Sequence, residues 1–256
     1  CHSKSKKSIT MNKIIKSIPN TLTCISLFFG CLSILYSIEE SFLYAVACIL
    51  IGSIFDFSDG FAARALKASS AIGKELDSLA DQVSFGVAPG FAIYFWMKGH
   101  VDCSLCEYLP YIAFLVPAFS ALRLAKFNID ERQTSSFIGL PTPANALFLS
   151  SLVSTSDILL KNGTSNWFTD FCSNPVAMIV IVIATSLLLV SEFPMFSLKF
   201  KHFGWAGNEK KFILIVFAVV AMIIFGMCGI LFAAAFTTIL FYMVMCIVDF
   251  FIKKRQ

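Results

Sequence analysis

The chain of 256 residues is 57% hydrophobic and only 14% charged, with a mean hydropathy of +0.80. A soluble domain of this size has no use for so much apolar surface, so the composition excludes that class and indicates a membrane protein. The formal net charge is only +4. We interpret it as a signal of membrane orientation and expect no nucleic-acid partner.

Apolar segments long enough to cross a bilayer recur along the whole chain. A membrane-spanning helix needs about 20 apolar residues, and eight segments meet this requirement. They lie at about 20–38, 42–63, 78–98, 108–127, 144–160, 175–193, 212–228 and 230–251. The last two form one run that is too long for a single span, and Gly226 and Gly229 offer a tight turn to divide it. The sequence therefore predicts an all-α, polytopic membrane helical bundle of about eight transmembrane helices.

The basic residues indicate how these helices are oriented. With the N-terminus in the cytoplasm, only Lys98 and Lys161 of the 20 Lys and Arg residues fall outside the cytoplasmic segments. This bias follows the positive-inside rule, so we expect both termini in the cytoplasm. We expect no cleavable signal peptide before the first span. Residues 1–10 precede a plausible start at Met11, and we expect them to be an added segment or a short disordered tail.

Four aspartates lie at the cytoplasmic ends of two consecutive predicted helices. Asp56 and Asp59 are three residues apart, and Asp77 and Asp81 are four apart, so each pair shares one face of its helix. The intervening segment is short and polar enough to turn at the membrane surface, and its Gly73 can adopt an unusual backbone angle. The turn would make the two helices antiparallel neighbours. We therefore expect the two pairs of carboxylates to come together.

Carboxylates at such close range repel one another and take up protons unless cations compensate them. Hard divalent cations prefer oxygen ligands, and two bridged cations recur where enzymes carry out displacement at phosphorus. Two alternatives remain: acids that pair or snorkel at a helix end, and an ion-pathway site in a cation-coupled transporter. A transporter would spread its acids over several spans and show symmetry between its halves. Here all four acids lie on two adjacent helices.

The aspartates stand in a longer motif, DFSDGFAARALKASSAIGKELDSLAD at residues 56–81, with the spacing D-x2-D-G-x2-A-R-x8-G-x3-D-x3-D. This pattern resembles the signature of the CDP-alcohol phosphotransferase family at all eight fixed positions, and the family's core would cover roughly residues 18–195. The resemblance implies a six-helix catalytic core, usually homodimeric, that moves a phosphate-bearing group from a CDP-linked donor to an alcohol. We expect a catalytic membrane domain at 11–210 and a C-terminal two-helix membrane extension at 211–256.

The resemblance also implies a metal centre and a catalytic base. The residues that would bind divalent metal, as two ions of Mg or Mn, are Asp56, Asp59, Asp77 and Asp81. Asp81 would also be the general base. The three histidines, His2, His100 and His202, lie outside the motif, which leaves direct attack on phosphorus assisted by a carboxylate.

The remaining motif positions would bind CDP and its phosphates. Gly60 and Gly73 belong to this set, and Gly60, without a side chain, would let the nucleotide approach the helix backbone. Ala63 would leave room for the cytidine, and Arg64 could hold a phosphate oxygen. The simpler alternatives are a packing glycine at position 60 and a positive-inside anchor at position 64.

Four segments resemble a narrower branch, the membrane-bound phosphatidylserine synthases. They are IPNTLTCISLFFGCLSI at 18–34, LDSLADQVSFGVAPG at 76–90, RLAKFNID at 123–130 and FIGLPTPANA at 137–146. The branch implies transfer from CDP-diacylglycerol to L-serine with release of CMP, at the cytoplasmic face of the cell (inner) membrane. The alternatives within the family are phosphatidylglycerophosphate, cardiolipin and inositol-phosphate-lipid synthesis.

An amino-acid acceptor needs partners for its carboxylate, its ammonium group and its hydroxyl. Arg123 or Lys126 could bind the carboxylate, and Asn128 can both donate and accept. Thr142 is the fourth candidate. It lies in the segment GLPTP at 139–143, which forms either a rigid wall of the pocket or simply the non-helical entry to the fifth span.

Overall fold

The computed structural model describes residues 2–100, 107–130, 137–196, 204 and 208–254. The described chain is almost entirely helical. The strands in these ranges are β1 (Phe137–Ile138) and β2 (Pro194–Met195), which form one short antiparallel pair. The expected all-α polytopic membrane protein is confirmed, with this small ladder added.

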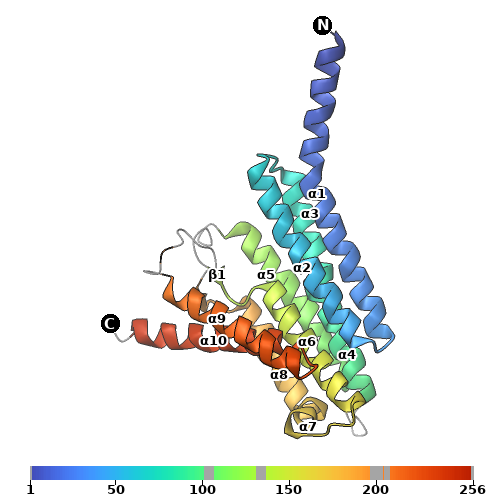
Figure 1. Cartoon of the computed structure of the whole chain (residues 1–256), viewed down its shortest axis with the longest axis vertical. Helices are drawn as coiled ribbons and strands as arrows, with labels where there is room; N and C mark the ends of the chain where they lie inside the picture. The colour runs from blue at the N-terminus through green and yellow to red at the C-terminus, as the bar shows by residue number, and fades with distance from the viewer. Residues whose placement is uncertain (1, 101–106, 131–136, 197–203, 205–207, 255–256) are drawn as a thin grey trace.

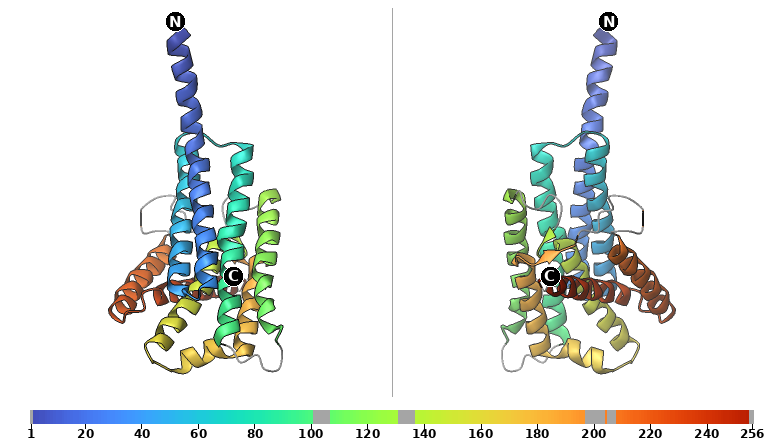
Figure 2. Two further views of the ribbon diagram at one scale, coloured as in Figure 1. Left: turned by 90° about the vertical axis from the view of Figure 1, so that its right-hand side faces the viewer. Right: turned by 90° about the vertical axis from the view of Figure 1, so that its left-hand side faces the viewer.

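The first half of the chain forms a bundle of long helices that lie alongside one another (Figure 1). Its elements are α1 (His2–Ile38), α2 (Phe42–Ala65), α3 (Ala71–Asp81), the π-helical segment η1 (Gln82–Val87), α4 (Ala88–His100), the 3₁₀ segment η2 (Leu109–Phe114), α5 (Leu115–Ile129) and α6 (Thr142–Lys161). The remaining helices are α7 (Trp167–Ser173), α8 (Pro175–Val190), α9 (Glu209–Met227) and α10 (Ala233–Lys254). Figures 1 and 2 show α9 and α10 lying across the direction of α1 and α2.

Six helices in the described part of the chain are long and apolar enough to cross a membrane. They are Ser17–Ile38, Phe42–Ala65, Leu109–Ile129, Thr142–Lys161, Glu209–Met227 and Ala233–Ile252. The pair of α7 and α8, bent by 75°, would make a seventh if it counts as one span. The third expected span, 78–98, falls on α3, η1 and α4, which follow one another without a break but are each shorter than 18 residues. The count of eight and the orientation therefore stay predictions.

Two local expectations have clear outcomes. Helix α1 begins at His2 and projects past the other helices (Figure 2), so the disordered tail expected at residues 1–10 is wrong for residues 2–10. Between α9 and α10, Gly229 has a φ of +75°. The glycine turn predicted to divide the last apolar run is therefore confirmed.

The apolar core forms where α4, α6 and α8 meet. Trp96, Leu149 and Met178 are fully buried there. The indole Nε1 of Trp96 donates to the carbonyl oxygen of Cys172 at 2.9 Å, which satisfies its one polar atom and ties α4 to α7.

Helix α1 and segment η1 approach each other closely. A Cβ atom added to Gly30 would overlap Ser84, and the Ser84 hydroxyl donates to the carbonyl oxygen of Ser26 at 3.1 Å. Small residues allow membrane helices to pack at such short range. This contact holds the helical run immediately after Asp81 against α1, and so fixes the position of the aspartate motif.

Candidate active site

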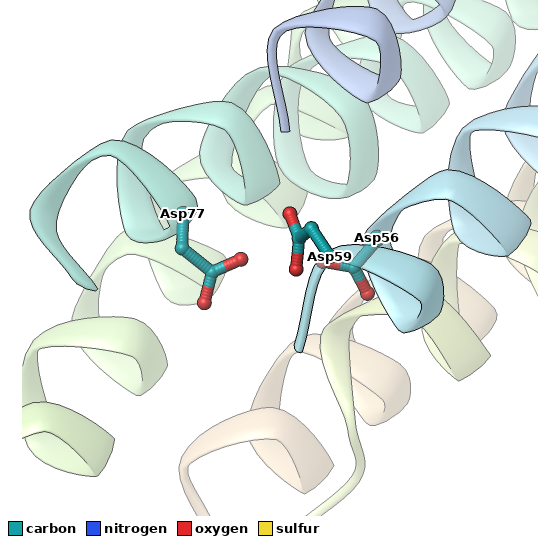
Figure 3. A group of neighbouring side chains, drawn as sticks. All are labelled: Asp56, Asp59 and Asp77. Atoms are coloured by element: carbon teal, nitrogen blue, oxygen red, sulfur yellow. The ribbon is translucent and has the colours of Figure 1, made fainter. Parts of the chain in front are cut away.

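Three of the motif aspartates form a compact cluster. Asp56 and Asp59 on α2 and Asp77 on α3 each offer a carboxylate oxygen, and these oxygens all lie within 4.8 Å of one another. Figure 3 shows the side chain of Asp77 pointing toward those of Asp56 and Asp59. Asp59 is buried and the other two are half-buried. The two ends of the motif therefore meet, as the sequence predicts.

Helix α1 helps to bring the aspartates together, which the sequence did not predict. Both α2 and α3 pack against α1, and their aspartates face each other across the space beside it. The Thr23 hydroxyl of α1 donates to Oδ2 of Asp59 at 2.5 Å. Since a hydrogen bond of this kind holds a ligand carboxylate in one orientation, Thr23 positions Asp59 within the cluster.

The donor set of the cluster fits a divalent cation. Carboxylate oxygens are the hard ligands that Mg²⁺ and Mn²⁺ prefer. Three of them converge from two helices, and carboxylates this close repel one another unless a cation lies among them. The residues present therefore match the metal that the signature implies.

Asp81 differs from the other three aspartates. It is the last residue of α3, lies within hydrogen-bonding reach of Asp56, and falls outside the group of three converging carboxylates. Its Oδ1 atom is buried without a hydrogen-bond partner among the described residues. Arg123 on α5 is close enough to interact with it electrostatically. An acceptor atom left without a partner beside a metal cluster is what a general base requires.

A cavity of about 230 Å³ opens beside the cluster, and we call it the donor cavity. Asp59 and Asp77 line it, together with all four residues predicted to bind CDP, namely Gly60, Ala63, Arg64 and Gly73. The four predicted CDP-binding residues are up to 13 positions apart in the motif, yet they line one cavity next to the carboxylates.

The two motif glycines border the donor cavity in different ways. A Cβ atom on Gly60 would meet only Nη1 of Arg64, at 3.5 Å, so this part of α2 is open to an incoming molecule. A Cβ on Gly73 would lie 3.0 Å from Oγ of Ser70 and 3.1 Å from Oδ1 of Asn20. Gly73 is helical, and the residue with positive φ in this turn is Lys67 at 50°. The unusual backbone angle expected of Gly73 is therefore wrong; the glycine instead lies close to the side chains of Asn20 on α1 and of Ser70 at the start of α3.

A second cavity, of about 320 Å³, lies between the end of α5, strand β1 and the end of α8, and we call it the acceptor cavity. Two of the predicted serine-binding residues, Arg123 and Lys126, line it together with Asp130 and Glu192. Arg123 is only 7% exposed, and its Nε atom has no hydrogen-bond partner in the described structure. Because Arg123 also interacts with Asp81, it connects this cavity to the aspartates.

The structure places the other two predicted serine-binding residues elsewhere. The side-chain Nδ2 of Asn128 donates to the Ser78 hydroxyl at 2.8 Å, and the backbone carbonyl oxygen of Asn128 accepts from Lys74 Nζ at 3.0 Å. Asn128 therefore links α5 to α3. Thr142 is fully buried at the start of α6, and its hydroxyl has no partner among the described residues. Neither residue is among those that line the acceptor cavity.

The segment 139–143 is the entry to α6. Gly139 has a φ of +75°, and the amides of Gly139 and Leu140 donate to carbonyl oxygens of Phe193 and Leu188 at 2.9 and 3.0 Å. Pro141 is the residue before the first helical turn. Of the two alternatives left open by the sequence, the structure shows the non-helical entry, held by the end of α8.

Several residues that border the two cavities were not predicted. Asn20, Thr23 and Lys74 line the donor cavity. The signal for Asn20 and Thr23 was available, since they are three residues apart on one face of a helix and lie in the segment 18–34. For Glu192 no local pattern exists, because it reaches the acceptor cavity only through the packing of α8 on α5.

Comparison with known proteins gives a consistent result. The chain matches the family model described as CDP-alcohol phosphatidyltransferase over residues 16–246. Three similar proteins are each named CDP-diacylglycerol–serine O-phosphatidyltransferase. The Mycobacterium leprae protein is 34% identical over 71% of this chain, which spans 58% of that relative's length. The Helicobacter pylori 26695 protein is 33% identical over 77% of the chain and 78% of its own length. The Bacillus subtilis protein is 34% identical over 75% of the chain and 94% of its own length. The chain thus belongs to the CDP-alcohol phosphatidyltransferase family.

Proposed function

We propose that this protein transfers the phosphatidyl group of CDP-diacylglycerol to L-serine and releases CMP. The observation that carries the proposal is the position of the aspartates relative to the two cavities. Asp59 and Asp77 line the donor cavity, and Arg123, which interacts electrostatically with Asp81, lines the acceptor cavity. Relatives over most of the chain bear the name of this activity.

The donor cavity suits the CDP part of the lipid. Arg64 and Lys74 supply cations at its edge, which would bind phosphate oxygens. Gly60 and Ala63 leave room for the nucleotide against α2. Because the cavity lies at the end of apolar helices, the acyl chains of the same molecule would stay in the bilayer.

Asp56, Asp59 and Asp77, together with Asp81, would hold two ions of Mg²⁺ or Mn²⁺. The positive charge of these ions would offset the negative charge of the pyrophosphate. Oδ1 of Asp81 would accept the proton of the serine hydroxyl while the serine oxygen bonds to the β-phosphorus. The bond from that phosphorus to the oxygen shared with CMP breaks in the same displacement, and CMP leaves. Arg123 would hold the serine carboxylate beside Asp81 and so orient the hydroxyl.

The same reasoning assigns a place in the cell. Arg64 and Lys74 line the same cavity as Asp59 and Asp77, and Lys67 lies in the turn between α2 and α3. These cations beside the aspartates would make this end of the bundle cytoplasmic. The active site would then lie at the cytoplasmic face of the inner membrane, with both termini on that side. As in the family that the motif resembles, the working unit would be a homodimer, with a catalytic domain at 11–210 and a two-helix extension at 211–256.

The test uses the purified full chain in detergent or proteoliposomes, with CDP-diacylglycerol and a panel of acceptors. We expect CMP release to be far faster with L-serine than with glycerol 3-phosphate or inositol. EDTA should abolish it, and Mn²⁺ or Mg²⁺ should restore it. A preference for glycerol 3-phosphate or inositol would refute serine as the acceptor. The absence of CMP release with every acceptor would favour the transporter alternative.

A further inference from the structure

We infer that Asp130 and Glu192 recognise the ammonium group of the acceptor, so that the acceptor cavity selects an amino acid over other alcohols. The inference rests on the proposed function and adds to it the two residues that would discriminate against acceptors without an amine. Neither residue belongs to the aspartate motif or to the four residues that the sequence assigned to serine.

The charges that line the acceptor cavity match a zwitterion. Arg123 and Lys126 contribute two positive charges, and Asp130 and Glu192 contribute two negative ones. The other lining side chains are aliphatic or neutral. A cavity for a phosphorylated or otherwise anionic acceptor would carry an excess of positive charge, and one for a neutral polyol would need no opposed charges. Balanced and separated charges are the complement of an amino acid.

The backbone arranges these charges on one side of the cavity. Arg123 and Lys126 are three residues apart and lie on one face of α5, and Asp130 is the residue that caps the end of this helix. Arg123 and Asp130 differ in height by roughly 10 Å along the helix. This distance is long enough to hold the arginine side chain and a small amino acid bound between Arg123 and Asp130. Glu192 follows the end of α8 and faces this row, and Lys126 Nζ lies 3.5 Å from the carbonyl oxygen of nearby Val190.

The charged residues of the acceptor cavity differ in burial, which suggests how a bound amino acid would be oriented. Arg123 is buried next to Asp81, Asp130 is half-buried, and Glu192 is exposed. An acceptor whose carboxylate pairs with Arg123 would have its hydroxyl close to Asp81 and its ammonium group toward the mouth of the cavity. Asp130 and Glu192 also interact with other groups of the protein, which does not prevent this, because a carboxylate offers about four acceptor sites.

The test compares Asp130→Asn, Glu192→Gln and the double variant with the unmodified protein. Both substitutions keep the size of the side chain and remove its charge. We expect the KM for L-serine to rise by about tenfold in each single variant, because each loses a charge-assisted hydrogen bond to the ammonium group. We expect kcat and the KM for CDP-diacylglycerol to change less than about twofold, since neither group touches the reacting atoms. The matched control is Glu39→Gln, an exposed acid in the turn between α1 and α2, at the other end of α2 from Asp59.

A second measurement isolates the ammonium group. 3-Hydroxypropionate has the carboxylate and hydroxyl of serine but no amine, so we expect the unmodified protein to discriminate strongly against it. The double variant should lose at least about tenfold of this discrimination. Because Glu192 is exposed, Glu192→Gln carries the test alone if a thermal melt shows that Asp130→Asn has unfolded.

The outcomes separate the inference from the proposed function. If the unmodified protein prefers serine while the folded variants keep its KM and its preference over 3-hydroxypropionate, the inference is overturned and the function stands. If the unmodified protein releases CMP with inositol or glycerol 3-phosphate and not with serine, the proposed function fails and the inference fails with it.

Discussion

Replacing Thr23 by valine tests how the metal cluster is held together. The two side chains have nearly the same shape, so the substitution removes the hydroxyl and little else. In the structure that hydroxyl donates to Oδ2 of Asp59 at 2.5 Å, and the two residues are only 4% and 6% exposed. We expect Asp59 to keep its place on α2 but to lose its fixed orientation toward Asp56 and Asp77.

The size of the effect follows from the negative charge of Asp59, which accepts the hydrogen bond from Thr23. A hydrogen bond to a charged group contributes about 1.5–3 kcal/mol, and about 1.4 kcal/mol corresponds to a factor of ten in binding. Loss of the Thr23 donor should therefore weaken metal binding by about 10- to 100-fold. The same range is typical when groups that orient metal ligands are removed.

The assay is a titration of the detergent-solubilised protein with Mn²⁺, followed by electron paramagnetic resonance of the free ion. The metal concentration that gives half-maximal CMP release is measured on the same samples. Thr21→Val is a matched control on the same helix. Thr21 is exposed, and its hydroxyl donates to the carbonyl oxygen of Ser17 at 3.0 Å. The Thr23 oxygen has the same position relative to Pro19, at 3.1 Å from its carbonyl oxygen. Thr23→Ser, which keeps the donor, should recover most of the affinity.

An Mn²⁺ affinity in Thr23→Val within about twofold of the unmodified protein would refute the reasoning. So would an equal loss of affinity in Thr21→Val, because the effect would then come from α1 in general and not from the bond to Asp59.

The remaining predictions concern the base, the donor cavity and the helix contact. In Asp81→Asn we expect turnover to fall by about 100-fold or more with CDP-diacylglycerol binding retained, whereas Asp59→Asn should lose both. Equal loss of lipid binding in the two variants would indicate that Asp81 acts mainly as a metal ligand and not as the general base. Gly73→Ala should raise the KM for CDP-diacylglycerol, because the added methyl group would crowd α1 and α3 at 3.0–3.1 Å; an unchanged KM would contradict this. Gly30→Ala, whose methyl group would overlap η1, should lower stability by about 1–3 kcal/mol in thermal unfolding. Gly226→Ala, with only one atom 3.6 Å away, is its control and should melt like the unmodified protein.

The parts of the site that the sequence predicted are those written in a local pattern. The spacing of the motif placed Asp56 and Asp59 on one helix face and Asp77 on another, and the structure brings them within 4.8 Å. The polar turn between them contains enough information for this, because it is short and makes the chain reverse direction, and both helices then pack against α1. The four residues of the CDP group share a cavity for the same reason.

The parts that the sequence did not predict depend on contacts between distant segments. Thr23 is one of several hydroxyl residues in α1. It shares a helix face with Asn20, but only the packing of α2 against α1 shows that its partner is Asp59. Asn128 has the right chemistry for a zwitterion, yet its amide is used by Ser78, 50 residues earlier in the chain. Glu192 reaches the acceptor cavity only because α8 returns to α5.

The π-helical segment η1 has a consequence for the phase of the helical run from Ala71 to His100. Each residue in an α-helix turns the side-chain direction by about 100°, and a π-helical turn admits an extra residue. The part before η1 can therefore aim its aspartates at α2 while α4, which follows η1, packs against α1 and α6. Deleting one residue within η1 would turn α3 relative to α4 by about 100° and direct the carboxylates away from their partners. Such a chain would keep every residue of the signature and still have no metal site, so the motif is sufficient only together with the wide turn that follows it.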